Sequence, residues 1–302
     1  MILSQPQESS PQNGIGNFFP SSYKVDQKKG RSVLVERNSL SHILNKLEML
    51  DIPGKPNIES YLRDQYRRNL RITTIRNSLF AVVSFLFLVK QGGKTRLEEI
   101  DRGDLSAFIE HEQDRGLKPA TVRNRLDNLK AFIRYQIRKE AVSAELLSKK
   151  MIIKVPDSLP KAMEIEHEAK LLSVINNVRN RAMILLLLRT GMRIGELLNL
   201  QVHDIHLKEK KIDIWEAQKT RVGRVVYFSA DAAAALNAWL QQRDPEKTLV
   251  FYACHRESLT YAGARIMFCK YLQKANLAHK GYTLHCLRHT NASSLLNAGI
   301  SL

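Results

Sequence analysis

Apolar residues recur every three to four positions through much of the chain, the spacing that places them on one face of an α-helix. The clearest stripe lies in residues 118–140 and consists of Val122, Leu126, Leu129, Ile133 and Ile137. Pro119 stands at its start, where proline favours the first helical turn. We therefore expect a long helix in this segment.

Two further helices are expected before this one. Residues 73–93 begin with a pair of threonines and end with a pair of glycines, and residues 98–116 form a shorter segment that ends at Gly116. The most apolar run, LFAVVSFLFLV, is broken by Ser84 and is far shorter than the roughly 18 residues that cross a bilayer. It predicts a buried core helix, and the whole pattern predicts a helical domain over residues 57–147.

The segments that flank this domain have a different composition. Residues 1–56 begin with a stretch rich in Gln, Ser, Pro and Asn, and we expect a flexible N-terminal region there, within which residues 39–50 have helical spacing. Residues 148–161 contain two prolines and four lysines, which is typical of an interdomain linker. The chain start has no signal-peptide pattern, and the three cysteines form no CxxC pair, so a cytoplasmic protein with free thiols is expected.

Residues 162–302 show a mixed pattern. Helical spacing is seen in residues 167–180 and 181–191, and again in three later segments, at 231–243, 261–275 and 283–299. Between them, Ile212 and Ile214 alternate with polar residues before Gly223 and a second apolar run, which indicates a β-hairpin. The expected fold is mostly α, with a small β-sheet or hairpin in this C-terminal domain.

The charge balance points to a polyanionic partner. The chain has 47 Lys and Arg residues against 30 Asp and Glu residues, for a formal net charge of +17. Nucleic acid is the most common partner of such a field, although a basic surface alone would give the same count. Arg123, Lys130 and Arg134 recur beside the apolar stripe of the long helix. They form either a solvated face or a face that binds DNA phosphates.

His285, Arg288 and His289 lie within five positions on a predicted helix. Two histidines four residues apart can bind zinc, and a metal-dependent nuclease would use them in that way. However, a permanently charged guanidinium beside a metal ion is repulsive, whereas beside a phosphate it is attractive. His285 and Arg288, three residues apart, are therefore better suited to one shared anion.

Two upstream cations extend this pattern. Arg193 follows Gly191 near the start of a predicted helix, whose amides would also favour an anion, and Lys219 lies in the predicted hairpin. Taken alone, Arg193 and Lys219 would each be interpreted as an ordinary surface residue. In order, however, TGMRIGELLNL, the hairpin lysine and HCLRHTNASSLLNAG resemble the tyrosine recombinase, or phage integrase, family. The resemblance covers about residues 57–302 and is strongest over 159–302.

The resemblance implies a role for each matching residue. Arg193 and Arg288 would clamp the scissile phosphate of DNA. Lys219 would be the general acid toward the leaving 5′-oxygen, and His285 would hydrogen-bond a phosphate oxygen and assist proton transfer. The implied activity is site-specific DNA recombination or integration, by breakage and rejoining of strands through a phosphotyrosine intermediate.

Further features follow from the same resemblance. His289 and Glu196 would be structural residues near the site. The partner would be double-stranded DNA, held by a helical core-binding domain and a catalytic domain that close around it as a C-shaped clamp. A synaptic tetramer is expected for a full-length protein, residues 1–56 would include a possible arm segment, and no metal or other cofactor is expected.

The sequence departs from the family pattern at its C-terminal end. In the family, a Gly-His motif and then the tyrosine nucleophile follow the second arginine, whereas this chain ends at Leu302. We therefore expect it to bind DNA without cleaving it and to assemble more weakly. A fragment, a naturally truncated product and a non-catalytic DNA-binding protein that occupies recombination sites are the alternatives left open.

Overall fold

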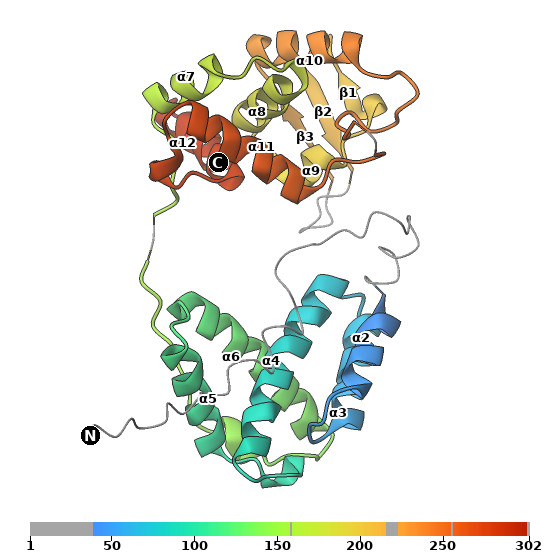
Figure 1. Cartoon of the computed structure of the whole chain (residues 1–302), viewed down its shortest axis with the longest axis vertical. Helices are drawn as coiled ribbons and strands as arrows, with labels where there is room; N and C mark the ends of the chain where they lie inside the picture. Colours follow the sequence, from blue (N-terminus) through green and yellow to red (C-terminus); the bar gives the residue numbers. More distant parts are fainter. Residues whose placement is uncertain (1–38, 158, 216–222, 255, 301–302) are drawn as a thin grey trace, which may run out of the picture. The chain divides into compact units, whose positions relative to one another are not determined.

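A computed structural model of the chain describes residues 39–157, 159–215, 223–254 and 256–300. The chain divides into two compact units, Met1–Asp157 (unit 1) and Ser158–Leu302 (unit 2), which are described separately (Figure 1). The division lies inside the predicted linker, where the described residues form neither helix nor strand.

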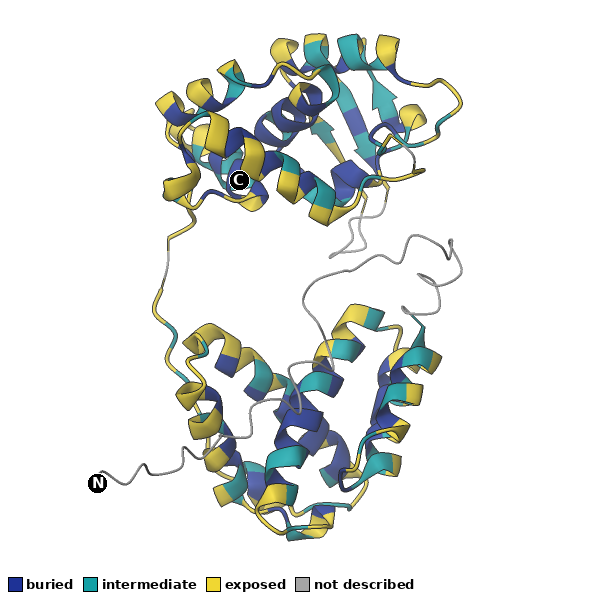
Figure 2. Ribbon diagram, viewed as in Figure 1, coloured by how far each residue is buried: buried dark blue, intermediate teal, exposed yellow. Residues whose placement is uncertain are grey.

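Unit 1 is a bundle of helices around α4. Its helices are α2 (Leu40–Glu48), α3 (Lys55–Arg67), α4 (Ile72–Gln91), α5 (Arg102–Asp114) and α6 (Pro119–Arg138), with 3-10 turns η1 (Leu97–Glu99) and η2 (Ala144–Leu147). Among the described helices, α4 alone is apolar and long enough to cross a membrane by length and composition. Its apolar side chains, however, lie in the core of the bundle against α3 and α6 (Figure 2).

The helix boundaries in unit 1 follow their local signals. Asp101 caps α5 by accepting a hydrogen bond from the Asp104 amide at 3.2 Å, and Pro119 occupies the first turn of α6. Gly116 adopts a left-handed conformation after α5, which glycine tolerates without strain. The three helices predicted from the sequence are confirmed.

The helical spacing of residues 39–50 is confirmed by α2, but the boundary predicted at residue 57 was wrong, because these residues belong to the helical bundle and not to a flexible region. Ile43 and Leu47 of α2 are 2% and 1% exposed and pack in the same core as α3 and α4. Their helical spacing buries enough apolar surface to order this short helix against the bundle. The remaining residues of that region, 1–38, lie outside the described residues.

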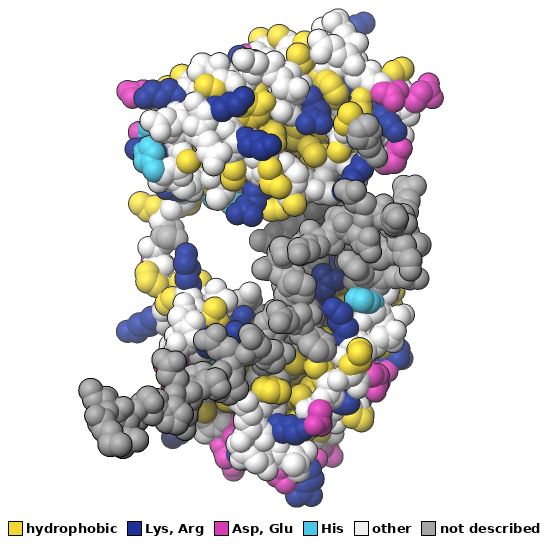
Figure 3. Space-filling view, viewed as in Figure 1, with side chains coloured by type: hydrophobic (Ala, Val, Ile, Leu, Met, Phe, Trp, Pro, Cys, Tyr) yellow, Lys and Arg dark blue, Asp and Glu magenta, His cyan; other side chains and the backbone are white. Residues whose placement is uncertain are grey.

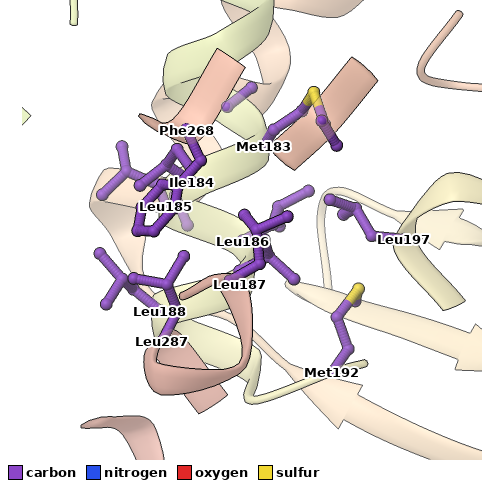
Figure 4. Close-up of a cluster of buried hydrophobic side chains, with 14 of the residues drawn as sticks. Met183, Ile184, Leu185, Leu186, Leu187, Leu188, Met192, Leu197, Phe268 and Leu287 are labelled. Carbon is purple, nitrogen blue, oxygen red and sulfur yellow. The ribbon is translucent and has the colours of Figure 1, made fainter. Parts of the chain in front are cut away.

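Unit 2 surrounds a central helix, α8 (Val178–Thr190). The other helices are α7 (Ile165–Ser173), α9 (Ile194–Leu198), α10 (Ala230–Gln242), α11 (Tyr261–Lys274) and α12 (Leu284–Asn297), with 3-10 turns η3 (Val202–Asp204) and η4 (Ala278–Lys280). Every residue from 182 to 188 is buried, and Leu197, Phe268 and Leu287 from three neighbouring helices pack around them (Figure 4).

A small antiparallel sheet completes unit 2. Strands β1 (Ile205–His206), β2 (Lys211–Ile214) and β3 (Arg224–Tyr227) lie in that order, with Ile214 paired to Arg224. The predicted hairpin is confirmed, and so is the fold class of a mostly helical protein with a small sheet. Strand β1 was not predicted, because two residues are too short to show an alternating pattern.

The boundary between the two helices predicted at 167–180 and 181–191 lies earlier than expected. The segment 167–180 breaks after Ser173, and α8 begins at Val178. Asn177 causes this new start, because its side chain accepts a hydrogen bond from the Asn180 amide at 3.0 Å and caps the first turn of α8.

Candidate functional site

The turn from α8 to α9 places Arg193. Gly191 ends α8 in a left-handed conformation with φ of 60° and donates its amide proton to the Leu187 carbonyl at 3.2 Å. Arg193 then adopts an extended conformation as the N-cap of α9, and its side chain is 28% exposed. The predicted position of Arg193 at a helix start is confirmed.

Helix α12 brings Arg288 to the same turn. Leu287 is fully buried against α8, and the neighbouring Arg288 donates a hydrogen bond to the backbone carbonyl of Gly191. One helical turn later, the Asn291 amide donates to the Leu188 carbonyl at 3.0 Å. These two bonds fasten α12 to the end of α8, so the two arginine motifs of the sequence meet in one place.

Glu196 organises the arginines at this turn. Its carboxylate accepts two hydrogen bonds from Arg193, one from the amide at 2.7 Å and one from Nη1 at 3.0 Å. It accepts two more from Arg224, at 2.9 and 2.7 Å. The carboxylate therefore occupies the N-terminus of the five-residue α9, where the sequence had led us to expect an anionic ligand.

Positive charges outnumber negative charges at the turn from α8 to α9. Burial alone would raise the pKa of Glu196, but the hydrogen bonds from Arg224 and Arg193 outweigh it and hold the pKa below 4.5. Burial and the positive charges of Arg193 and Arg224 lower the pKa of Arg288. Three guanidinium groups thus face one carboxylate, which leaves positive charge available to an anion.

Arg224 was missed in the sequence. It opens β3 after a glycine and reads there as an ordinary strand residue. The position of Arg224 near the site becomes visible in the register of the strands, because paired residues of two antiparallel strands point to the same face of the sheet. Arg224 is paired with the buried Ile214 and therefore lies on the face of the sheet that is turned toward the core.

The two histidines of α12 lie against each other. The rings of His285 and His289 are 4.6 Å apart between centroids and meet edge to face, with His285 exposed and His289 half-buried. Within the described ranges, no group of three or more His, Cys, Asp or Glu side chains is placed to hold a metal ion. In the described part of the chain, the two histidines therefore have no third side chain of these types beside them that would complete a metal site.

Lys219, the predicted general acid, lies in residues 216–222, outside the described residues. The structure describes the strands on either side of this segment, which are β2 and β3.

Tyr282 precedes α12 and is 5% exposed. Its hydroxyl is 2.9 Å from Nδ1 of the buried His167. This pairing fixes the tyrosine as part of the core of unit 2.

Three basic residues of α6 were predicted to bind DNA in unit 1. Arg134 is exposed, and Arg123 is 61% exposed with Asp127 at 4.0 Å. Lys130 is half-buried and donates a hydrogen bond to the Met151 carbonyl at 2.7 Å, so it fastens the start of the linker to the bundle. Arg123 and Arg134 are therefore the more accessible of the three.

The surface of unit 2 has a basic face. In the view of Figure 3, Lys and Arg side chains occupy the centre of this unit, whereas Asp and Glu side chains lie toward its edges. Such a distribution is favourable for a polyanion that lies across the face.

The chain is similar to known proteins in sequence. Residues 161–302 match the phage integrase family. Tyrosine recombinase XerC of Pelotomaculum thermopropionicum is 28% identical over 219 residues, which cover 68% of this chain and 71% of that protein.

Two solved structures have a similar fold. The Tn1549 transposon integrase in complex with a circular intermediate DNA gives a TM-score of 0.66 at 19% identity, over 83% of this chain and 89% of that chain. A lambda integrase tetramer bound to a Holliday junction gives 0.65 at 17% identity, over 89% of this chain and 78% of that chain. At these identities the likeness concerns the fold.

Proposed function

We propose that this chain, which belongs to the phage integrase family of tyrosine recombinases through residues 161–302, acts in site-specific DNA recombination. Unit 2, which contains both arginine motifs, would bind a phosphate of duplex DNA between Arg193 and Arg288. The observation that carries the proposal is that Arg288 is hydrogen-bonded to Gly191, two residues before Arg193, within a cluster of three arginines and one carboxylate.

The chemistry explains why arginines suit this site. When a nucleophile attacks a phosphodiester, negative charge spreads over the oxygens of the transferring group. Guanidinium groups that are already held in place stabilise this charge without reorganising, and their planar forks match two phosphate oxygens. The hydrogen bonds to Glu196 and Gly191 provide this fixed arrangement for Arg193 and Arg288.

The other steps of the reaction are assigned by the family motif. His285 would hydrogen-bond a phosphate oxygen, and Lys219 would protonate the leaving 5′-oxygen. A tyrosine would attack the phosphate and keep the bond energy in a covalent phosphotyrosine, which the 5′-hydroxyl of a second strand then reverses. Tyr282 is unsuited to this role because its hydroxyl is buried against His167.

The proposed partners are duplex DNA and further copies of the chain. The net charge of +17 supports DNA binding, as do the exposed Arg123 and Arg134 of unit 1. Similarity in fold to an integrase that was solved as a tetramer on a Holliday junction supports self-association. We place the protein in the cytoplasm, where DNA is accessible.

The direct test measures binding of the chain to a 30-base-pair duplex at several salt concentrations. The Arg193→Gln and Arg288→Gln substitutions should each weaken binding about tenfold, because each removes a charge-assisted contact to phosphate. Affinity of the unchanged chain should also fall steeply as salt rises. If affinity were independent of salt, or if both variants bound normally, the proposal would be wrong.

A second measurement distinguishes strand transfer from simple occupation of a site. The chain is incubated with nicked duplexes and separated by denaturing electrophoresis. A covalent protein–DNA adduct would support strand transfer by this chain, whereas binding without an adduct would support the alternative of a non-catalytic protein that occupies recombination sites.

A further inference from the structure

The Glu196 carboxylate is almost completely buried, with its side chain 1% exposed, yet it lies next to a site that must attract an anion. A carboxylate has about four lone-pair positions for hydrogen bonds. All four are occupied here, two by Arg193 and two by Arg224. The second arginine has no role in the function proposed above.

Arg224 binds Glu196 in the bidentate geometry that is characteristic of strong arginine–carboxylate pairs. Its Nη1 and Nη2 donate to the two different oxygens at 2.9 and 2.7 Å. Arg193 contacts the same carboxylate through a single guanidinium nitrogen. Most of the side-chain donors of Arg193 are therefore not committed to Glu196, and its side chain remains 28% exposed.

We propose that Arg224 is a positioning residue, which neutralises Glu196 so that Arg193 keeps its positive charge and its remaining donors for a DNA phosphate. The inference rests on the proposed function, because it takes Arg193 as a phosphate ligand. Arg224 acts through Glu196 and does not itself contact the DNA.

The charge count explains why this arrangement is needed. With Arg224 in place, three positive groups face one negative group, and two positive charges remain for the phosphate. Without Arg224, one positive charge remains, and two acceptor positions on Glu196 become vacant. The Arg193 guanidinium would then turn toward Glu196 to form the bidentate pair, and its donors would be withdrawn from the phosphate.

The experiment is a double-mutant cycle on binding to a 30-base-pair duplex. It compares the unchanged chain with Arg224→Gln, Glu196→Gln and the double variant E196Q/R224Q. The Arg224→Gln variant should bind about fivefold more weakly, with a salt slope reduced by about 0.9, the value for one phosphate contact. The double variant restores the original charge count and should bind within about twofold of the unchanged chain.

Two further variants control for charge and for folding. Arg224→Lys keeps the positive charge beside Glu196 and should recover most of the affinity. Arg189→Gln is the matched control, because Arg189 is likewise paired with carboxylates, Glu168 at 2.7 Å and Asp231 at 3.0 Å, but takes no part in the site. It should leave DNA binding unchanged. Thermal unfolding of each variant verifies that it is folded.

Each outcome decides the matter. Recovery of binding in E196Q/R224Q supports the proposal. If the double variant bound as weakly as Arg224→Gln alone, Arg224 would be a direct ligand of the DNA and the positioning role would be wrong. Normal binding by Arg224→Gln would also overturn it. If instead the unchanged chain showed no salt-dependent DNA binding, the proposed function itself would fail.

Discussion

The Arg288 guanidinium donates a hydrogen bond to the backbone carbonyl of Gly191 and so joins residues 97 positions apart in the chain. Gly191 is left-handed, and a Cβ atom at this position would lie 2.5 Å from the Asn291 Oδ1. Asn291 cannot readily withdraw, because its amide is bonded to the Leu188 carbonyl. The glycine thus allows α12 to approach the end of α8 closely.

Gly191→Ala should lower the free energy of unfolding by about 3 kcal/mol, since it adds a steric clash to left-handed backbone strain. Gly299→Ala is the control, because Gly299 is also left-handed but has nothing within 4 Å of its Cβ position. The control should lose only about 1 kcal/mol. Urea unfolding measures both, and equal losses would show that the close approach to Asn291 is unimportant.

Multivalent anions should stabilise the chain through the arginine cluster. Since burial and, after it, the like charges of neighbouring arginines lower the pKa of Arg288, its charged form is disfavoured while the site holds no anion. Inorganic phosphate at pH 7 should raise the unfolding temperature by a few degrees relative to sodium chloride at the same ionic strength, roughly as expected when a ligand exceeds its Kd severalfold. Arg288→Gln should show less than half of this increase, and an equal increase would locate anion binding elsewhere.

The buried Glu196 should make stability depend on pH. Its pKa is lowered in the folded state, so its contribution is fully present above pH 4.5 and is lost as the pH falls through the lower folded value. At pH 7, Glu196→Gln should cost about 2 kcal/mol of unfolding free energy, because charged hydrogen bonds become neutral ones. This difference from the unchanged chain should shrink toward pH 3, as measured by urea unfolding. A difference that stayed constant with pH would contradict the assignment.

Two basic residues of α6 should behave differently. Arg134→Ala should change the unfolding free energy by less than about 0.5 kcal/mol, because Arg134 is exposed. It should reduce the salt slope of DNA binding by about 0.9. Lys130→Ala removes the hydrogen bond to the Met151 carbonyl and should cost about 1 kcal/mol, with little change in the salt slope. If Lys130→Ala instead reduced the salt slope and Arg134→Ala instead lowered the unfolding free energy, Lys130 would be the DNA ligand and Arg134 the structural residue.

Much of the fold could be predicted because its signals are local. Pro119 begins α6, and Gly191 ends α8, as their residue types require. The helix boundary at Asn177 was missed, since an asparagine cap inside a continuous apolar pattern is a weak signal. The start of the helical domain was placed too late, at residue 57, because the inclusion of α2 depends on packing against distant helices.

The site was only partly predictable for a similar reason. Arg193 and Arg288 could be found because each stands in a short sequence motif. Arg224 has no motif, and its importance depends on its register opposite Ile214 and on Glu196, 28 positions away. Pairing of this kind becomes visible only once the chain is folded.

The start of unit 2 is fastened to its last helix, since the Met163 amide donates to the Thr290 hydroxyl at 2.8 Å across 127 positions. A ribosome that adds about 5–20 residues per second needs roughly 6–25 s to synthesise the chain between these two residues. In the later part of that interval Arg193 has already been made, but α12 has not, and the part of α8 that packs against α12 is uncovered. The proposed phosphate site therefore cannot form until α12 has been synthesised, and protection of α8 by a chaperone would matter most in those seconds.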